Sequence, residues 1–331
     1  MLRPKVELHC HLEATLRPDT FRDLTKSHFE SIDHARGFVS LDNFFRGYRR
    51  LQDALTDEAS WERLAYESVL DAAKDNVIYR EAFFTPARQM AANVPLSNIV
   101  NGLCRGLEYG ENATGLRTAL IADIDRSYGA AAGLEFVRQI ASLRRGSSVV
   151  ADRIIGIGMD TAELRTKPED FVAAYREAKR CGLQRTAHVG IDRPAEDIWT
   201  ALDVLDCERI DHGLTVLEDS VLVSRIAEEG IPLTVCPSSN VAVGRYSNLR
   251  LHPFPVMRRA GIQVSLNTDN PALLGLSLEE EYQRIQSVFG YSDAEMVDIA
   301  ITGANSSWLD AAGRAELVNR ICGDEHQSVH S

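Results

Sequence analysis

Two histidines separated by a single residue stand near the start of the chain, in the segment ELHCHL. Side chains alternate along a β-strand, so His9 and His11 would share one face with Glu7 and lie about 6–7 Å apart. Two imidazoles at that spacing can close on one metal ion, but such a pair also occurs as surface or hydrogen-bonded histidines. The pair alone leaves a metal site and a structural role both open.

Three further groups that can bind a metal or carry a proton follow later apolar segments. They are His188 in QRTAHVG, His212 in ERIDHG and Asp269 in IQVSLNTD. Imidazole and carboxylate ligands without thiolate suit zinc, with iron and manganese as the alternatives, and leave a coordination position for water. These residues predict a metal centre if their segments end at the same place in the fold.

Short β-branched segments alternate with longer segments of helical periodicity along the chain. The predicted strands cover residues 5–12, 76–84, 116–125, 153–160, 184–190, 208–213, 231–239 and 262–269. Apolar residues between them recur at helical spacing, and Gly182 and Gly230 stand where helices end. This alternation predicts a parallel sheet, and eight units without a glycine-rich phosphate loop favour a closed (β/α)8 TIM barrel over an open sheet.

The predicted barrel would place the candidate ligands together. Catalytic residues of such barrels lie at the C-terminal ends of the strands, where the histidines and the aspartate occur here. The stretch from 13 to 75 is too long for a single crossover. We therefore expect it to add helices that cover the active-site rim.

Composition and charge narrow the class of protein. Of 331 residues, 44% are hydrophobic and 25% are charged, which is typical of a globular protein with a large core. The net charge of −12 disfavours nucleic acid and anionic membranes, and no apolar span or signal peptide is evident. Six scattered cysteines indicate reduced thiols, so we expect a cytoplasmic protein with a small-molecule substrate; a homo-oligomer stays open.

We expect one domain over residues 1–322 and a flexible polar tail over 323–331. The remaining histidines fall in loop, helix or tail patterns, and we expect them at the surface without a role in the site: His28, His34, His252, His326 and His330. Cys236 has no activating base nearby in the sequence, so we expect a buried, unreactive thiol.

Five motifs resemble, in order, those of the adenosine and adenine deaminases of the amidohydrolase superfamily. They are KVELHCHLEATLRPDTF, AHVG, ERIDHG, CPSSN and SLNTDNP. The resemblance extends into LSLEEEYQRIQSVFG and GANSSWLD and covers nearly the whole chain. The segments IPLTVCPSSN and GMDTAE look more like the bacterial adenine-deaminase branch than the nucleoside branch.

The resemblance implies a zinc-dependent hydrolase of carbon–nitrogen bonds. It implies that His212 orients a water molecule and helps to carry its proton, and that Asp269 accepts a proton and also contacts the metal. Zinc lowers the pKa of its water ligand from about 15.7 to about 7, which suits hydrolysis at neutral pH. The implied metal ligands are His9, His11, His188 and Asp269.

Three positions near the site depart from the family pattern. The family has a glutamate three residues after its third histidine, which protonates the purine ring, whereas this chain has Ile191. Loss of a general acid removes a factor of about 10² to 10⁴ in rate. Asn270 replaces the second of two paired aspartates but can still donate a hydrogen bond, and Ala14-Thr15 replaces a glycine and adds volume. We expect these residues to line the substrate pocket: Ile191, Asn270, Asp160 and Thr15.

The sequence leaves three functions open. The favoured one is a zinc hydrolase that deaminates an amino-bearing heterocycle or a related substrate, with a specificity altered from adenosine. The second is an ordinary adenine or adenosine deaminase that tolerates the substitutions. The third is an inactive protein that binds a purine-like ligand, and the intact set of metal-binding groups argues against it. Asp192 would replace the missing acid only if its loop shifts, because its side chain is expected to point elsewhere.

Overall fold

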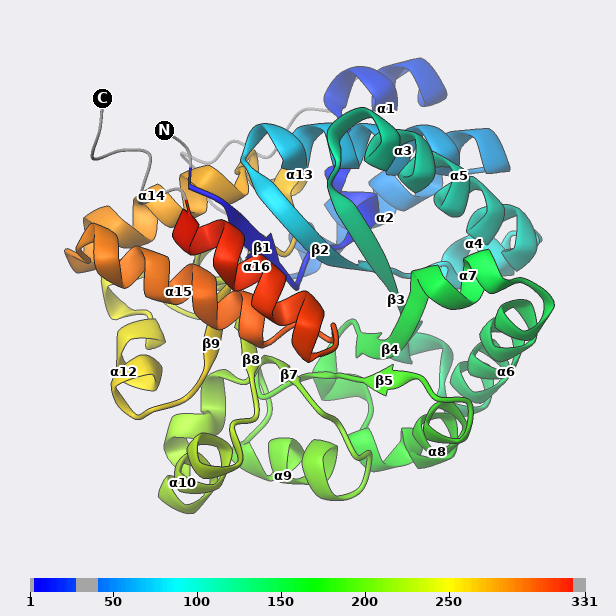
Figure 1. The fold of residues 1–331 in the computed structure, drawn as a ribbon. Coiled ribbons are helices and arrows are strands. Elements are labelled where there is room, and N and C mark those ends of the chain that lie inside the picture. Colours follow the sequence, from blue (N-terminus) through cyan, green and yellow to red (C-terminus); the bar gives the residue numbers. More distant parts are fainter. Residues whose placement is uncertain (1–2, 28–40, 324–331) are drawn as a thin grey trace, which may run out of the picture.

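The computed structural model describes residues 3–27 and 41–323 and shows parallel strands surrounded by helices (Figure 1). The strands are β1 Lys5–Glu7, β2 Val77–Phe84, β3 Arg117–Asp125, β4 Ile154–Asp160, β5 Gln184–Arg185, β6 His188–Val189, β7 Ile210–His212, β8 Leu233–Val235 and β9 Val264–Leu266. The first five form one parallel sheet and the last four another. A parallel bridge between Cys10 and Asp269 joins the two ends. The predicted (β/α)8 barrel is confirmed.

The strand expected over 184–190 consists of two short pieces. β5 pairs with β4, whereas β6 pairs with β7. Thr186 and Ala187 connect them, and their backbone still bonds to both neighbours: Thr186 N–H donates to Ile157 O (3.0 Å) and Ala187 O accepts from Asp211 N–H (3.0 Å). β5 and β6 therefore act together as one of the eight strands of the barrel. This strand pairs with one sheet through β5 and with the other through β6.

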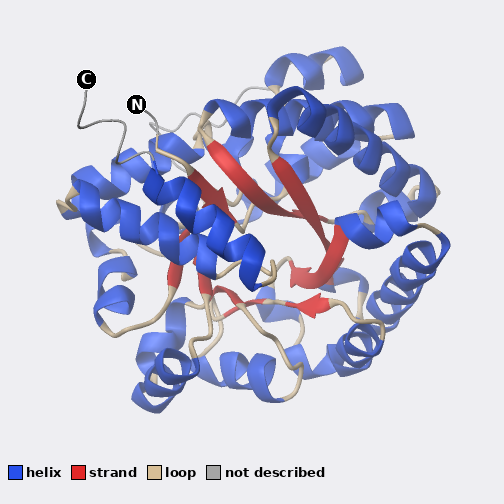
Figure 2. Ribbon diagram, viewed as in Figure 1, coloured by secondary structure: helices blue, strands red, loops and turns tan. Residues whose placement is uncertain are grey.

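Helices form the outer layer around the strands (Figure 2). The α-helices are α1 Pro18–Thr25, α2 Leu41–Asp53, α3 Glu58–Lys74, α4 Ala87–Ala91, α5 Leu96–Thr114, α6 Ala130–Gly146, α7 Ser148–Arg153, α8 Val172–Arg180, α9 Ala195–Asp203, α10 Ser220–Glu229, α11 Pro237–Ala242, α12 Phe254–Arg259, α13 Pro271–Leu274, α14 Leu278–Phe289, α15 Asp293–Asn305 and α16 Ala311–Gly323. Short 3-10 helices are η1 Leu12–Thr15, η2 Arg126–Tyr128, η3 Glu163–Arg165, η4 Pro168–Phe171, η5 Leu214–Glu218 and η6 Leu249–Leu251.

Local sequence explains where several helices begin and end. Asp219 accepts hydrogen bonds from the first turn of α10, and Gly230 ends that helix in the left-handed conformation. Gly182, just after α8, also has a positive φ of 68°. None of the helices in the described part of the chain has the length and apolar character that a bilayer crossing requires.

The long connection after β1 contributes η1, α1, α2 and α3, as expected. α2 places Phe44, Phe45 and Tyr48 against the cavity described below, so it covers the rim of the barrel. α3 instead packs closely on α5 at the outside, where a Cβ on Gly106 would lie 2.1 Å from Glu62 O.

The opposite end of the barrel is closed by a buried ion pair and an aromatic ring. Arg209, just before β7, binds Glu81 of β2 at 2.6 Å, and neither side chain is exposed. The ring of Trp308, between α15 and α16, lies 3.9 Å from the Arg209 guanidinium, and its backbone N–H donates to Glu81. The N-terminal ends of the strands are thus filled, and the open cavity lies at their C-terminal ends.

Some expectations fall outside the described residues. His28, His34, His326 and His330 belong to that group, as do residues 324–331 of the expected tail. Gly323, expected to begin the tail, is the last residue of α16.

Candidate metal centre and active-site cavity

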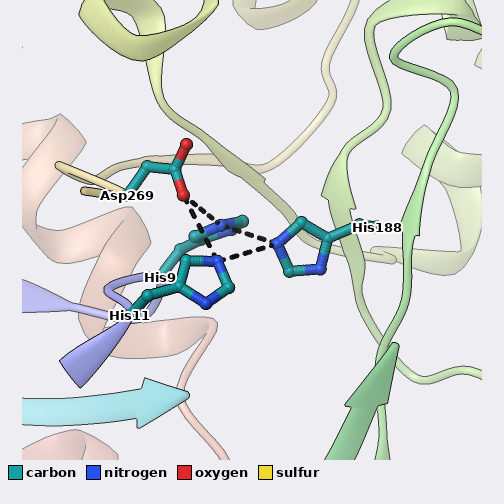
Figure 3. Close-up of side chains that lie close together, drawn as sticks. All are labelled: His9, His11, His188 and Asp269. Atoms are coloured by element: carbon teal, nitrogen blue, oxygen red, sulfur yellow. Dashed lines mark hydrogen bonds and ion pairs between the residues drawn. The ribbon is translucent and has the colours of Figure 1, made fainter. Parts of the chain in front are cut away.

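Four buried side chains from distant parts of the sequence point toward one another at the C-terminal end of the barrel (Figure 3). His188 Nε2 lies 3.1 Å from His9 Nε2 and 3.2 Å from His11 Nε2. Asp269 Oδ1 lies 3.3 Å from the Nε2 atom of both His9 and His11. His9 and His11 follow β1, His188 begins β6, and Asp269 follows β9. The barrel thus brings together the residues whose metal-binding role the sequence suggests.

The outer nitrogens of two histidines have partners that fix their protons. Thr234 donates its hydroxyl proton to Asp211 (2.7 Å), so its oxygen accepts from His9 Nδ1–H at 2.9 Å. His188 Nδ1 lies 3.1 Å from the carbonyl oxygen of Met159, which can only accept. Both rings therefore carry their proton on Nδ1 and direct an Nε2 lone pair toward the other.

Converging lone pairs repel one another, and a cation between them removes that repulsion. Zinc bonds of about 2.1 Å in tetrahedral geometry separate neighbouring ligand atoms by about 3.4 Å. The separations of 3.1 to 3.3 Å between the four groups are close to that value. Three imidazole nitrogens and one carboxylate oxygen, with the outer nitrogens hydrogen-bonded, fit a divalent metal such as zinc.

Asp269 lies at the seam of the barrel, which is the place where the bridge between Cys10 and Asp269 joins its two ends. Its N–H donates to His9 O (3.0 Å), and its carbonyl accepts from His11 N–H (2.8 Å). Its backbone has a positive φ of 65°, which a non-glycine residue adopts at a cost of about 1 kcal/mol or more. Burial would raise the pKa of Asp269, but the neighbouring imidazoles of His11 and His9 outweigh it and hold the pKa well below the usual range. Asp269 is therefore a carboxylate, with Oδ2 bonded to the Ser239 hydroxyl at 2.5 Å.

Protonation of the imidazoles is set by burial and by their neighbours. Burial and the adjacent rings of His9 and His11 lower the pKa of His188 well below its usual value, which keeps it neutral, as a ligand must be. Burial alone would lower the pKa of His11, but Asp269 and Asp160 raise it overall.

Two carboxyl groups lie behind His11. Its Nδ1 is 3.9 Å from both Asp123 and Asp160, and neither Nδ1 nor the Asp123 oxygens have a hydrogen-bond partner. Burial and the neighbouring Asp160 raise the pKa of Asp123 well above the usual range, whereas burial and Asp125 raise that of Asp160 to about 7. This group can hold a proton beside the proposed metal ligand His11.

A cavity of about 620 Å³, including its open mouth, lies over these residues. Its walls combine apolar side chains with several carboxylates, and no lysine or arginine lines it within the described residues. The lining comprises His11, Phe44, Phe45, Tyr48, Asp160, Thr161, Ala162, Glu163, His188, Ile191, Asp192, His212, Ser239, Asn240, Val243, Asp269 and Asn270.

The loop after β6 is held rigidly by Glu163. The Glu163 Oε2 atom accepts the N–H groups of Ile191 (3.0 Å), Asp192 (2.6 Å) and Arg193 (3.2 Å), and the side chain is buried. Asp192 forms an ion pair with Arg245. With its backbone held and its carboxylate paired, Asp192 is poorly placed to replace the acid that Ile191 lacks.

The other expected pocket residues lie in different places. Asp160 and Asn270 line the cavity, and the buried amide oxygen of Asn270 has no hydrogen-bond partner. Thr15 instead lines a separate cavity with Glu7 and Cys10, and its hydroxyl donates to Leu12 O (2.7 Å). Glu7 also faces that second cavity, so it does not accompany His9 and His11 as strand alternation suggests, because β1 ends at Glu7.

His252 corrects a prediction. It was expected at the surface, but it is buried with 2% exposure in the turn before α12. Its Nδ1 accepts the backbone N–H of Phe254 (3.1 Å) and its Nε2 bonds Asn240 (3.1 Å), which in turn bonds His212 (3.1 Å). The sequence around His252 and Pro253 has no helical or strand periodicity, so the burial of His252 could not be predicted from it.

Other functional neighbours were not predicted, although the motifs contain some of them. Asp211 precedes His212 in ERIDHG, and Ser239 and Asn240 belong to CPSSN. Thr234 lies in the quoted segment IPLTVCPSSN and Glu163 ends GMDTAE, while Thr186 of QRTAHVG donates to Asp211 at 2.8 Å. Asp211 could have been predicted as a neighbour of the site, because it is a charged residue directly before His212 in a segment expected to form a buried strand.

A parallel (β/α)8 barrel with three imidazoles and a carboxylate at the C-terminal ends of its strands defines a metal-dependent hydrolase of the amidohydrolase type. The family model for adenosine deaminase matches residues 4–323. The chain belongs to the adenosine deaminase family. Its predicted class, a hydrolase acting on carbon–nitrogen bonds, is confirmed.

Relatives and solved structures agree with this assignment. Adenine deaminase of Trichlorobacter lovleyi is 32% identical over 327 residues, covering 96% of this chain and 92% of the relative. The crystal structure of an adenine deaminase from Arthrobacter aurescens has a TM-score of 0.90 and 32% identity, covering 98% of this chain and 99% of that one. An amidohydrolase from Burkholderia ambifaria with bound zinc has a TM-score of 0.88 and 30% identity, covering 98% and 91%.

Proposed function

We propose that the protein removes an amino group hydrolytically from a small neutral heterocycle, with a specificity altered from that of adenosine deaminases. The observation that carries the proposal is the convergence of four ligand groups at the floor of a cavity whose wall has Ile191 in place of a proton donor. Adenine itself is the second candidate substrate, because two proteins that are 32% identical to this chain are described as adenine deaminases.

Zinc is the metal we propose, held by His9, His11, His188 and Asp269. The donor set, the fixed Nδ1 protons and the zinc in the Burkholderia relative support this choice. A zinc ion bound there supplies Lewis acidity and lowers the pKa of a water molecule.

The chain's own residues would bind, orient and move protons. Asp269 keeps Oδ1 beside the histidines at the floor of the cavity, where it would accept a proton from a group bound there. His212 lines the same cavity and would orient the reacting groups. Asn270 has an amide oxygen without a partner and would bind a hydrogen-bond donor on the substrate.

Charge and polarity in the cavity favour a neutral substrate. Acidic side chains line it, and no lysine or arginine is among the described lining residues, so the cavity wall has no cationic side chain to bind a phosphate group. Phe44, Phe45 and Ile191 offer apolar surface to a planar ring. A base or amino-heterocycle fits these walls better than a nucleotide. We also infer a cytoplasmic location, which the free cysteines support.

The test is ammonia release by zinc-loaded protein with adenine, adenosine, AMP and a panel of amino-heterocycles with and without a ring nitrogen beside the amino group. We expect turnover of at least one neutral heterocycle and none of AMP. Asp269→Asn should reduce the rate by about 10² or more, whereas the exposed Asp298→Asn should not change it. Metal-loaded protein that turns over no member of the panel, or that prefers AMP, would contradict the proposal.

A further inference from the structure

A chain of hydrogen bonds leads from the start of α12 to His212. It begins at the backbone N–H of Phe254, which is always a donor, and this group points at Nδ1 of His252 (3.1 Å). Nδ1 must therefore be the unprotonated nitrogen of a neutral ring. Burial lowers the pKa of His252 to about 3, which agrees with a neutral ring.

Each later bond in the chain has its direction set by the first. A neutral His252 with an unprotonated Nδ1 carries its proton on Nε2, which lies 3.1 Å from Asn240. That proton needs an acceptor, so the Asn240 atom facing it is the amide oxygen. The amide nitrogen of Asn240 then faces His212 Nδ1 at 3.1 Å and donates to it.

We propose that His252 is a positioning residue that, through Asn240, fixes His212 in the tautomer with its proton on Nε2. All three side chains are buried, with exposures of 1% to 3%, so water does not compete for these bonds. The Nδ1 edge of His212 is taken by Asn240, and its Nε2 edge is left for the cavity that His212 lines.

The tautomer separates His212 from the neighbouring histidines. His9 and His188 carry their protons on Nδ1 and direct lone pairs inward, as ligands do. His212 directs an N–H inward, although its ring centroid is only 4.7 Å from that of His9. His212 is thus a hydrogen-bond donor rather than a fourth imidazole ligand.

The tautomer also divides the work between two residues, a consequence that rests on the proposed function. With its Nε2 already protonated, neutral His212 can donate to an oxygen atom in the cavity but cannot accept a proton from it. The accepting role then falls to Asp269, whose Oδ1 lies 3.3 Å from His9 Nε2 at the floor of the cavity. A catalytic imidazole held in the wrong tautomer loses up to about 10⁴-fold in rate.

The test is long-range ¹⁵N–¹H correlation NMR of zinc-loaded protein labelled on its histidine rings, because protonated and unprotonated ring nitrogens have well-separated shifts. Signals of the two rings are assigned from the spectra of His212→Asn and His252→Leu. We expect protonated Nε2 and unprotonated Nδ1 in both His212 and His252 of the unaltered protein. A protonated Nδ1 on His212 would overturn the proposal, and this readout requires neither substrate nor turnover.

Three variants test whether the hydrogen bonds from His252 through Asn240, here called the relay, control the tautomer of His212. Asn240→Asp places a carboxylate that can only accept, so Nδ1 of His212 should become protonated; the same change at the exposed Asn248 should leave the spectrum unaltered. His252→Gln keeps a donor for Asn240 and should retain the original tautomer, whereas His252→Leu should give a mixture. An unchanged His212 tautomer in folded Asn240→Asp or His252→Leu would show that the relay does not control it.

Discussion

Hydrogen-bond partners outside the cavity determine what each imidazole inside it can do. Thr234 and Asp211 hold the His9 proton, and the Met159 carbonyl holds that of His188. Such outer partners orient ligands and raise their basicity, and their loss commonly weakens metal binding by about 10- to 100-fold. Identical side chains thus differ in chemistry because their buried neighbours differ.

Ile191→Glu should raise adenine deamination by about 10² to 10⁴, because it restores an acid beside the substrate on a loop already fixed by Glu163. Ammonia release from adenine is the measurement. Ile191→Gln is the matched control, since it has the same length and hydrogen-bonding capacity but no acid proton. Equal rates for the glutamate variant and the unaltered protein, at equal zinc content, would indicate a pocket shaped for another ring.

For single residues, the sequence predicted which side chains belong to the site better than it predicted the contacts around them. His9, His11, His188 and Asp269 could be singled out because strand ends in a barrel converge by symmetry. The burial of His252 could not, because it depends on contacts with Asn240 and Phe254 that no local periodicity encodes.

Among the elements, the strands were predicted in the right order, but β1 ends at Glu7 rather than at residue 12 and β8 at Val235 rather than at residue 239. The strand over 184–190 was not predicted to divide. Its division reflects a change of hydrogen-bonded neighbour, which is a property of the assembled sheet rather than of the segment. The helices after β1 were expected from length alone, but which side chains of α2 would reach the cavity required the structure.

The contact between α11 and α14 contains a buried acid that makes stability depend on pH. Glu281 accepts the backbone N–H of Ser238 (2.9 Å) and its hydroxyl, and burial raises the pKa of Glu281 from 4.5 to about 7. The folded state therefore holds this proton more tightly than the unfolded chain. The resulting stabilisation is complete below pH 4.5 and is lost as the pH rises through 7.

Glu281→Gln should remove this dependence because an amide does not ionise. Between pH 5 and pH 8 the unaltered protein should lose about 2–3 kcal/mol more unfolding free energy than the variant. Urea unfolding at the two pH values measures the difference, and Glu228→Gln, at an exposed position of α10, serves as the control. Parallel pH profiles for the unaltered protein and Glu281→Gln would show that Glu281 ionises normally.

In the whole molecule, the metal-binding groups join parts of the barrel that are far apart in sequence. His9 and His11 follow β1, His188 begins β6 and Asp269 follows β9. A bridge between Cys10 and Asp269 joins the two ends of the barrel. The barrel as a class could be predicted from alternation of strands and helices. That the metal ligands lie where the two ends of the barrel meet depends on how the barrel closes. The sequence indicates this only by placing His9 and His11 near the first strand and Asp269 near the last.

A metal bound across the seam should therefore stabilise the entire barrel. Because the ion binds the folded state, stability should increase by about 2.7 kcal/mol when free zinc is 100 times its dissociation constant. Chelation should lower the thermal midpoint by several degrees, and added zinc should restore it, as measured by calorimetry. His188→Ala, which removes one ligand, should lose most of this response, whereas His252→Gln should keep it. A zinc response of the same size in His188→Ala would place the stabilising ion somewhere other than between these four side chains.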